Sequence, residues 1–87
     1  MDYSEKLKEV IKKYETNQYN EFEFQESLNS IVALITEYEY FELRRFLHDA
    51  AEELERINYL VEERFAREEY LKVINQIEKT AYLLEST

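Results

Sequence analysis

The sequence predicts an all-α protein, an antiparallel bundle of four helices, and three observations support that prediction. The chain has 87 residues and no glycine, proline or cysteine, so it lacks both the tight hairpin turns and the disulfides common in small β-rich domains. Its composition, 36% charged and rich in Glu, Leu, Lys and Ile, favours helix. Apolar residues also recur every three or four positions along four segments, as on one face of a helix. A chain of this length is expected to form one domain, residues 1–87, with one core.

Two apolar stripes lie in the first half of the chain. They consist of Tyr3, Leu7, Val10 and Tyr14, and of Phe24, Leu28, Ile31, Ile35 and Tyr38. Asp2 with Glu5, and Asn20 with Glu23, have the spacing of a capping box at the start of these two segments. The sequence Thr-Asn-Gln-Tyr-Asn at residues 16–20 supplies a connection between them.

Two further stripes fill the second half of the chain. They consist of Leu43, Leu47, Ala50, Leu54, Ile57 and Val61, and of Tyr70, Ile74, Ile77, Ala81 and Leu84. The step from Tyr38 to Leu43 rotates the stripe by about 140°, which predicts a break near Thr36–Tyr40. Thr36 and Glu39 have capping-box spacing there.

The boundary between the third and fourth stripes is less marked. The step from Val61 to Tyr70 turns the apolar face by about 180° and predicts a turn within Glu62–Arg67. That segment contains no residue that breaks a helix, so one long helix over residues 40–84, giving three helices in all, is the alternative. The expected core contains Leu28, Ile31, Ile35, Leu47, Leu54, Ile57, Ile74 and Ile77.

Negative charge is concentrated in one quarter of the chain. The net charge is −9, and residues 21–42 contribute six glutamates without a lysine or arginine. Aromatic residues, among them Phe22, Tyr38 and Phe41, are interleaved with these acids. Such a field attracts cationic partners and repels phosphate, so a basic protein partner is expected and nucleic acid is not. The candidate partner-binding residues are Glu21, Glu23, Glu26, Glu37, Glu39, Tyr40 and Glu42.

Other classes of function have little support in the sequence. His48, with Asp49 beside it, and Glu52 one turn on could place two ligands on one face, but a closed metal site needs a third and a fourth, and no cofactor motif is present. No serine has the context of a catalytic nucleophile, so an enzyme is not expected. The longest uncharged stretch, Ser27–Thr36, is too short to span a membrane, and no signal peptide is visible. A cytoplasmic location is expected.

The stretch Phe22–Leu28 (Phe-Glu-Phe-Gln-Glu-Ser-Leu) resembles the second helix of small colicin-D-like immunity proteins. In size, acidity and helical character the chain resembles bacterial immunity proteins of that type or of the contact-dependent-inhibition type. The resemblance implies a cytoplasmic antitoxin that forms a one-to-one complex with a toxin domain, for which a basic nuclease is the candidate. The alternative is a helical adaptor or regulatory module that self-associates or binds a partner helix. A monomer or weak homodimer is expected, and the acidic block is either an interface or only a solvated face.

Overall fold

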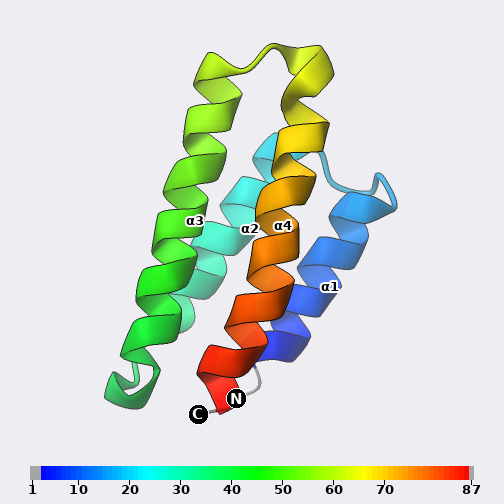
Figure 1. The fold of residues 1–87 in the computed structure, drawn as a ribbon. Coiled ribbons are helices and arrows are strands. Elements are labelled where there is room, and N and C mark those ends of the chain that lie inside the picture. The colour runs from blue at the N-terminus through cyan, green and yellow to red at the C-terminus, as the bar shows by residue number, and fades with distance from the viewer. Residues whose placement is uncertain (1–2, 87) are drawn as a thin grey trace.

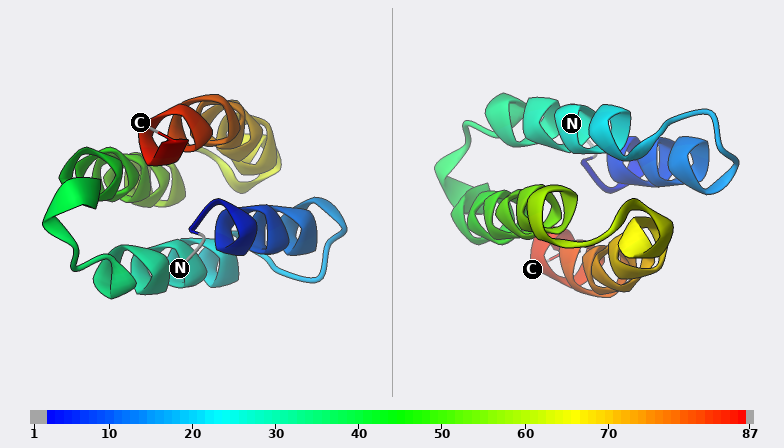
Figure 2. Two further views of the ribbon diagram at one scale, coloured as in Figure 1. Left: turned by 90° about the horizontal axis from the view of Figure 1, so that it is seen from below. Right: turned by 90° about the horizontal axis from the view of Figure 1, so that it is seen from above.

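The computed structural model describes residues 3–86, which form four α-helices and one short 3₁₀ turn. The elements are α1 (Tyr3–Glu15), α2 (Glu21–Leu34), η1 (Tyr38–Tyr40), α3 (Phe41–Leu60) and α4 (Glu63–Ser86). Successive helices run in opposite directions (Figure 1). The α1–α2 hairpin forms one layer and the α3–α4 hairpin the other (Figure 2). The all-α, four-helix prediction is confirmed, and residues 40–84 form two helices rather than one.

The core lies between these two layers. All eight residues expected in the core are buried, and Leu28, Leu47 and Leu54 are completely inaccessible to solvent. Tyr14, Phe24 and Tyr70 form an aromatic cluster in this core, with ring centroids 5.3–6.3 Å apart. The cluster joins α1, α2 and α4, so aromatic packing links the two hairpins.

The turn between α1 and α2 follows the sequence prediction closely. The Asn20 side chain accepts a hydrogen bond from the Glu23 backbone N–H, and the Glu23 carboxylate accepts one from the Asn20 N–H. This reciprocal pair is the predicted capping box. Asn17 has a φ of 66°, a left-handed conformation that asparagine tolerates better than most residues, so the chain reverses without glycine. The other capping box predicted in the first half of the chain, at the start of α1, involves Asp2, which lies outside the described residues.

The connection between α2 and α3 differs from the sequence prediction in two respects. Tyr38, expected to continue the apolar stripe of α2, is 94% exposed. The stripe ends because α2 stops at Leu34 and the backbone is extended at Ile35 and Glu37. Thr36 does not begin the next helix as a capping residue either: the residue before η1 is Glu37, and it makes no side-chain capping hydrogen bond. The predicted position of the break is nevertheless confirmed.

Smaller differences concern the two outer helices. The apolar stripe predicted for α1 contains Val10, but Val10 is only half-buried and its neighbour Ile11 is buried. Because α1 packs against both α2 and α4, its buried surface includes more than one row of side chains. The break between α3 and α4 falls at the start of the predicted range, where Val61 has an extended backbone and α4 begins at Glu63. None of the helices in residues 3–86 combines the length and the apolar character that a membrane span requires.

Candidate functional site

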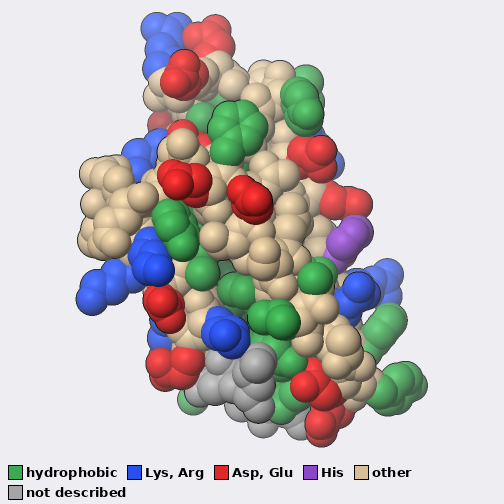
Figure 3. All heavy atoms as spheres, turned by 180° about the vertical axis from the view of Figure 1, so that it is seen from behind, with side chains coloured by type: hydrophobic (Ala, Val, Ile, Leu, Met, Phe, Trp, Pro, Cys, Tyr) green, Lys and Arg blue, Asp and Glu red, His purple; other side chains and the backbone are tan. Residues whose placement is uncertain are grey.

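The six glutamates of the acidic block occupy two places in the fold, because α2 separates them. A helix of 14 residues is about 21 Å long at 1.5 Å per residue. The upper acidic group, at the start of α2, consists of Glu21, Glu23 and Glu26, and the lower acidic group, beyond its end, consists of Glu37, Glu39 and Glu42. From behind the molecule, acidic side chains are scattered among hydrophobic ones over the upper and lower parts of the face (Figure 3). The block is therefore not one continuous patch.

Two members of the upper acidic group make contacts within the protein. The Tyr14 hydroxyl donates a hydrogen bond to Glu21 Oε2 at 2.7 Å, and the Glu23 carboxylate belongs to the capping box. Burial and the bond to Glu21 raise the pKa of the Tyr14 hydroxyl above its ordinary value. Among the described residues, Glu26 is the exposed member of this group whose carboxylate has no such contact. It is the member best placed to meet a partner.

The lower acidic group is similarly divided. The Tyr3 hydroxyl donates a hydrogen bond to the Glu37 carboxylate, 2.7 Å from Oε2, and this bond holds the pKa of that carboxyl below its usual value. Glu39 and Glu42 are exposed. Tyr40 is half-buried and packs edge-to-face on Tyr3, with ring centroids 5.5 Å apart. Tyr40 thus contributes to packing at the lower end of the bundle, in addition to any contact with a partner.

A cleft between α2 and α3 combines aromatic and acidic side chains. It has a volume of about 300 Å³, and its lining includes Phe22 and Glu26 from α2 and Glu55 and Tyr59 from α3. Phe22 and Tyr59 are 68% and 81% exposed, high values for aromatic residues. Among the described residues that line the cleft, none is basic. Aromatic faces and carboxylates both attract cations, so this cleft favours a positively charged group.

Amide side chains complete the lining of this α2–α3 cleft, and two of them form a hydrogen bond between its two helices. The Asn58 amide donates a hydrogen bond to Gln25 Oε1 at 2.6 Å, from α3 to α2. Asn29 lies one turn beyond Gln25 and lines the same cleft. The Gln25–Asn58 bond therefore connects α2 and α3 at the cleft.

Sequence reasoning found part of this cleft and missed the rest. Glu26 was a candidate residue, but Glu55 and Tyr59, about thirty residues further along the chain, were not. The available signal was the position of the aromatic residues: Phe22 and Tyr59 both lie off the apolar stripes of their helices. Only the antiparallel packing of α2 on α3 brings them to one cleft.

The three possible metal ligands around His48 lie on one exposed surface of α3. Ligand atoms of His48, Asp49 and Glu52 all lie within 4.8 Å of one another. His48 is 3.8 Å from a carboxylate oxygen of each acid. All three residues are exposed, and a closed tetrahedral site needs a fourth protein ligand.

We therefore expect that treatment with a chelator leaves the melting temperature of the protein unchanged, since the described residues around His48 do not form a closed site. Differential scanning calorimetry before and after dialysis against EDTA measures this, with His48→Ala as the matched variant. A stoichiometric metal in elemental analysis, lost in His48→Ala, would contradict the prediction.

No protein-family model, curated protein or solved structure matches this chain.

Proposed function

We propose that this protein is a non-enzymatic binding protein that captures a basic protein partner at the α2–α3 cleft. The observation that carries the proposal is the lining of the cleft, in which the described residues include two exposed aromatic rings and two carboxylates but no basic side chain. A lysine or arginine of the partner would lie between Phe22 and Tyr59 and pair with Glu26 or Glu55. A cation over an aromatic face contributes about 0.5–2 kcal/mol, more as water is excluded.

In this proposal, the acidic residues outside the cleft raise the association rate and contribute little to the lifetime of the complex. Glu39 and Glu42 are exposed and lie at the far end of α2 from the cleft. A net charge of −9 raises the rate at which a cationic partner arrives, while charged groups at the rim contribute little to the lifetime of a complex. The cleft and the lower acidic group therefore have separable effects on kinetics.

The candidate partner is a nuclease-type toxin domain, and the protein would be its immunity protein. A nuclease lines its active site with lysine and arginine to hold phosphate. Carboxylates of an inhibitor can take the place of phosphates there, and exposed aromatic rings can take the place of stacked bases. The acidity of the chain and its resemblance to small immunity proteins support this choice. The complex would be one-to-one and would form in the cytoplasm.

Two double variants with the same change in charge test the role of the cleft. We expect Glu26→Gln with Glu55→Gln to raise the dissociation rate from a basic nuclease domain at least tenfold. We expect Glu52→Gln with Glu63→Gln, exposed positions outside the cleft, to alter only the association rate. Tyr59→Ala should act like the cleft variant, since it removes one of the two rings. Surface plasmon resonance over a salt series, with a panel of basic nuclease toxin domains, measures both rates.

The outcomes of this experiment discriminate between the cleft and net charge. Equal effects of the two double variants would mean that charge alone governs binding and that the cleft plays no part. Failure of every domain in the panel to bind would contradict a general affinity of the cleft for basic nuclease domains. A stable homodimer of the free chain in light scattering, with the cleft covered, would favour the adaptor function instead.

A further inference from the structure

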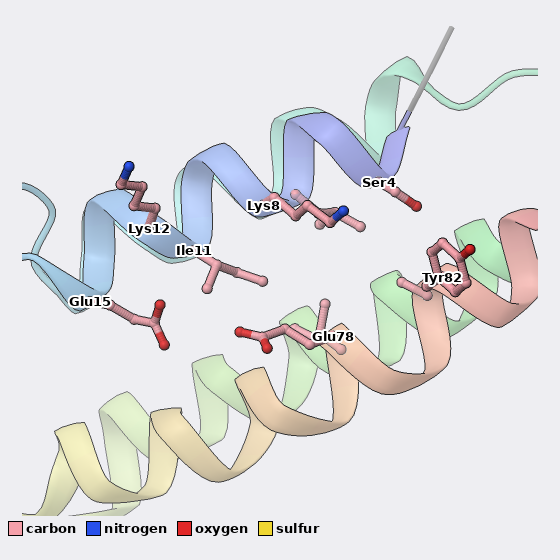
Figure 4. Close-up of a pocket in the computed structure, with 10 residues that line it drawn as sticks. Ser4, Lys8, Ile11, Lys12, Glu15, Glu78 and Tyr82 are labelled. Carbon is pink, nitrogen blue, oxygen red and sulfur yellow. The ribbon is translucent and has the colours of Figure 1, made fainter.

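A second groove lies between α1 and α4, away from the α2–α3 cleft. It has a volume of about 410 Å³, within the range of small-molecule pockets. Its floor is apolar and consists of Leu7 and Ile11 from α1 and Ile77 and Ala81 from α4, all of them core residues. The groove follows the two helices, and the close-up shows side chains of both along its edges (Figure 4).

The α1–α4 groove has a carboxylate from each helix in its lining, on the side away from Ser4 and Tyr82 (Figure 4). Glu15 and Glu78 extend from α1 and α4 toward one another (Figure 4). Both are exposed, and neither carboxylate has a hydrogen bond or ion pair to another described side chain. Two carboxylates that face each other repel, so a cation placed between them is stabilised by both.

The basic residues of the groove belong to its α1 edge rather than to this end. The Lys12 side chain points away from α4, and the Lys8 side chain extends along α1 toward Ser4 and Tyr82 at the opposite end (Figure 4). Ser4 lies eleven residues before Glu15, about 16 Å along the helix. The groove therefore has an acidic end, an apolar floor and a distant end with hydroxyl groups.

We propose that the α1–α4 groove binds an aliphatic primary amine. The ammonium group would lie between Glu15 and Glu78 and donate hydrogen bonds to both, while the unbranched tail would cover Leu7, Ile11, Ile77 and Ala81. The net charge of −9 favours this choice over an aliphatic anion, which would have to approach a strongly acidic protein. The proposal is independent of the proposed function, because it concerns another face and a small molecule.

The test uses hexyl-, octyl- and decylammonium with the isotopically labelled protein. We expect affinity to rise by up to about fourfold for each added methylene group, the value for a methylene that is fully removed from water. Nuclear magnetic resonance titration should place the largest methyl shifts at Leu7, Ile11, Ile77 and Ala81. Glu15→Gln with Glu78→Gln should weaken decylammonium binding at least tenfold. The control, Glu52→Gln with Glu63→Gln, changes the net charge equally and should alter binding less than twofold.

Three results would overturn the proposal. The first is equal weakening of decylammonium binding in the groove variant and the control. The second is a set of methyl and aromatic shifts centred on Phe22 and Tyr59 instead of the groove floor. The third is binding of decanoate as tight as that of decylammonium, since the acidic end would then have no role. Far-UV circular dichroism confirms that each variant is folded before titration.

Discussion

Replacing Leu54 by alanine is expected to lower the free energy of unfolding by about 2–5 kcal/mol. Leu54 lies in the middle of α3, is completely buried and belongs to the hydrophobic core between the two hairpins. The substitution removes apolar contacts and leaves a cavity that the surrounding helices fill only in part. A domain of this size has a stability of order 5 kcal/mol, so a large fraction of the variant would be unfolded. Urea denaturation followed by far-UV circular dichroism measures the change.

The matched control for Leu54→Ala is Glu55→Ala, one residue further along the same helix. Glu55 is exposed, and alanine is the better helix former, so its stability should change by less than about 0.5 kcal/mol. Equal destabilisation by both substitutions would show that the effect arises from the helix itself rather than from the core. An unchanged denaturation midpoint for Leu54→Ala would contradict the assignment of the apolar stripe of α3.

The fold could be predicted from the sequence because apolar periodicity and capping residues indicate the same helices along most of the chain. The apolar stripe of α3 and the Asn20–Glu23 capping box each depend on neighbours within a few residues, and both are confirmed. Tyr38 was misplaced because stripe spacing alone does not show where a helix ends. The position of Tyr38 depends on the extended backbone that leads from α2 into η1, and neither glycine nor proline marks that change in the sequence.

The candidate site was less accessible from sequence, because it depends on distances between helices. Counting charges identified an acidic block, but it could not show that α2 divides the block into two groups. Nor could it show that Glu21 and Glu37 accept hydrogen bonds from buried tyrosines of α1. Tyr59 belongs to the cleft only because α3 runs antiparallel to α2, which brings it near Phe22. Off-stripe aromatic residues were the one usable signal.

Removing the buried hydroxyl of Tyr70 is expected to raise the stability of the protein. Tyr70 is completely buried among Tyr14 and Phe24, and its hydroxyl has no hydrogen-bond partner of good geometry within residues 3–86. The nearby Asn58 amide donates a hydrogen bond to Gln25 Oε1. A buried polar group without a partner costs about 1–3 kcal/mol, so Tyr70→Phe, which keeps the ring, should raise the free energy of unfolding by a similar amount. Urea denaturation at neutral pH measures it.

The same hydroxyl makes the stability of the protein depend on alkaline pH. Burial raises the pKa of Tyr70 to about 12, with a smaller opposing effect from the Asn58 side chain. The unfolded chain releases this proton near pH 10, whereas the folded protein retains it up to about pH 12. Unfolding therefore releases protons in that range, and stability falls as the pH rises from about 10 to about 12. Tyr14, whose pKa is also raised, contributes in the same direction.

Thermal melts between pH 9 and pH 12 therefore separate the contribution of Tyr70 from that of Tyr14. The stability of Tyr70→Phe should fall less steeply with rising pH than that of the wild type, because only the contribution of Tyr14 remains. Tyr59→Phe changes an exposed residue, so its stability should follow the wild-type curve. If Tyr70→Phe is less stable than the wild type at neutral pH, the hydroxyl has a favourable partner, for which Asn58 is the nearest candidate. The double variant Tyr70→Phe, Asn58→Ala would then show a coupling free energy between the two side chains, whereas an unpaired hydroxyl predicts that the two effects add.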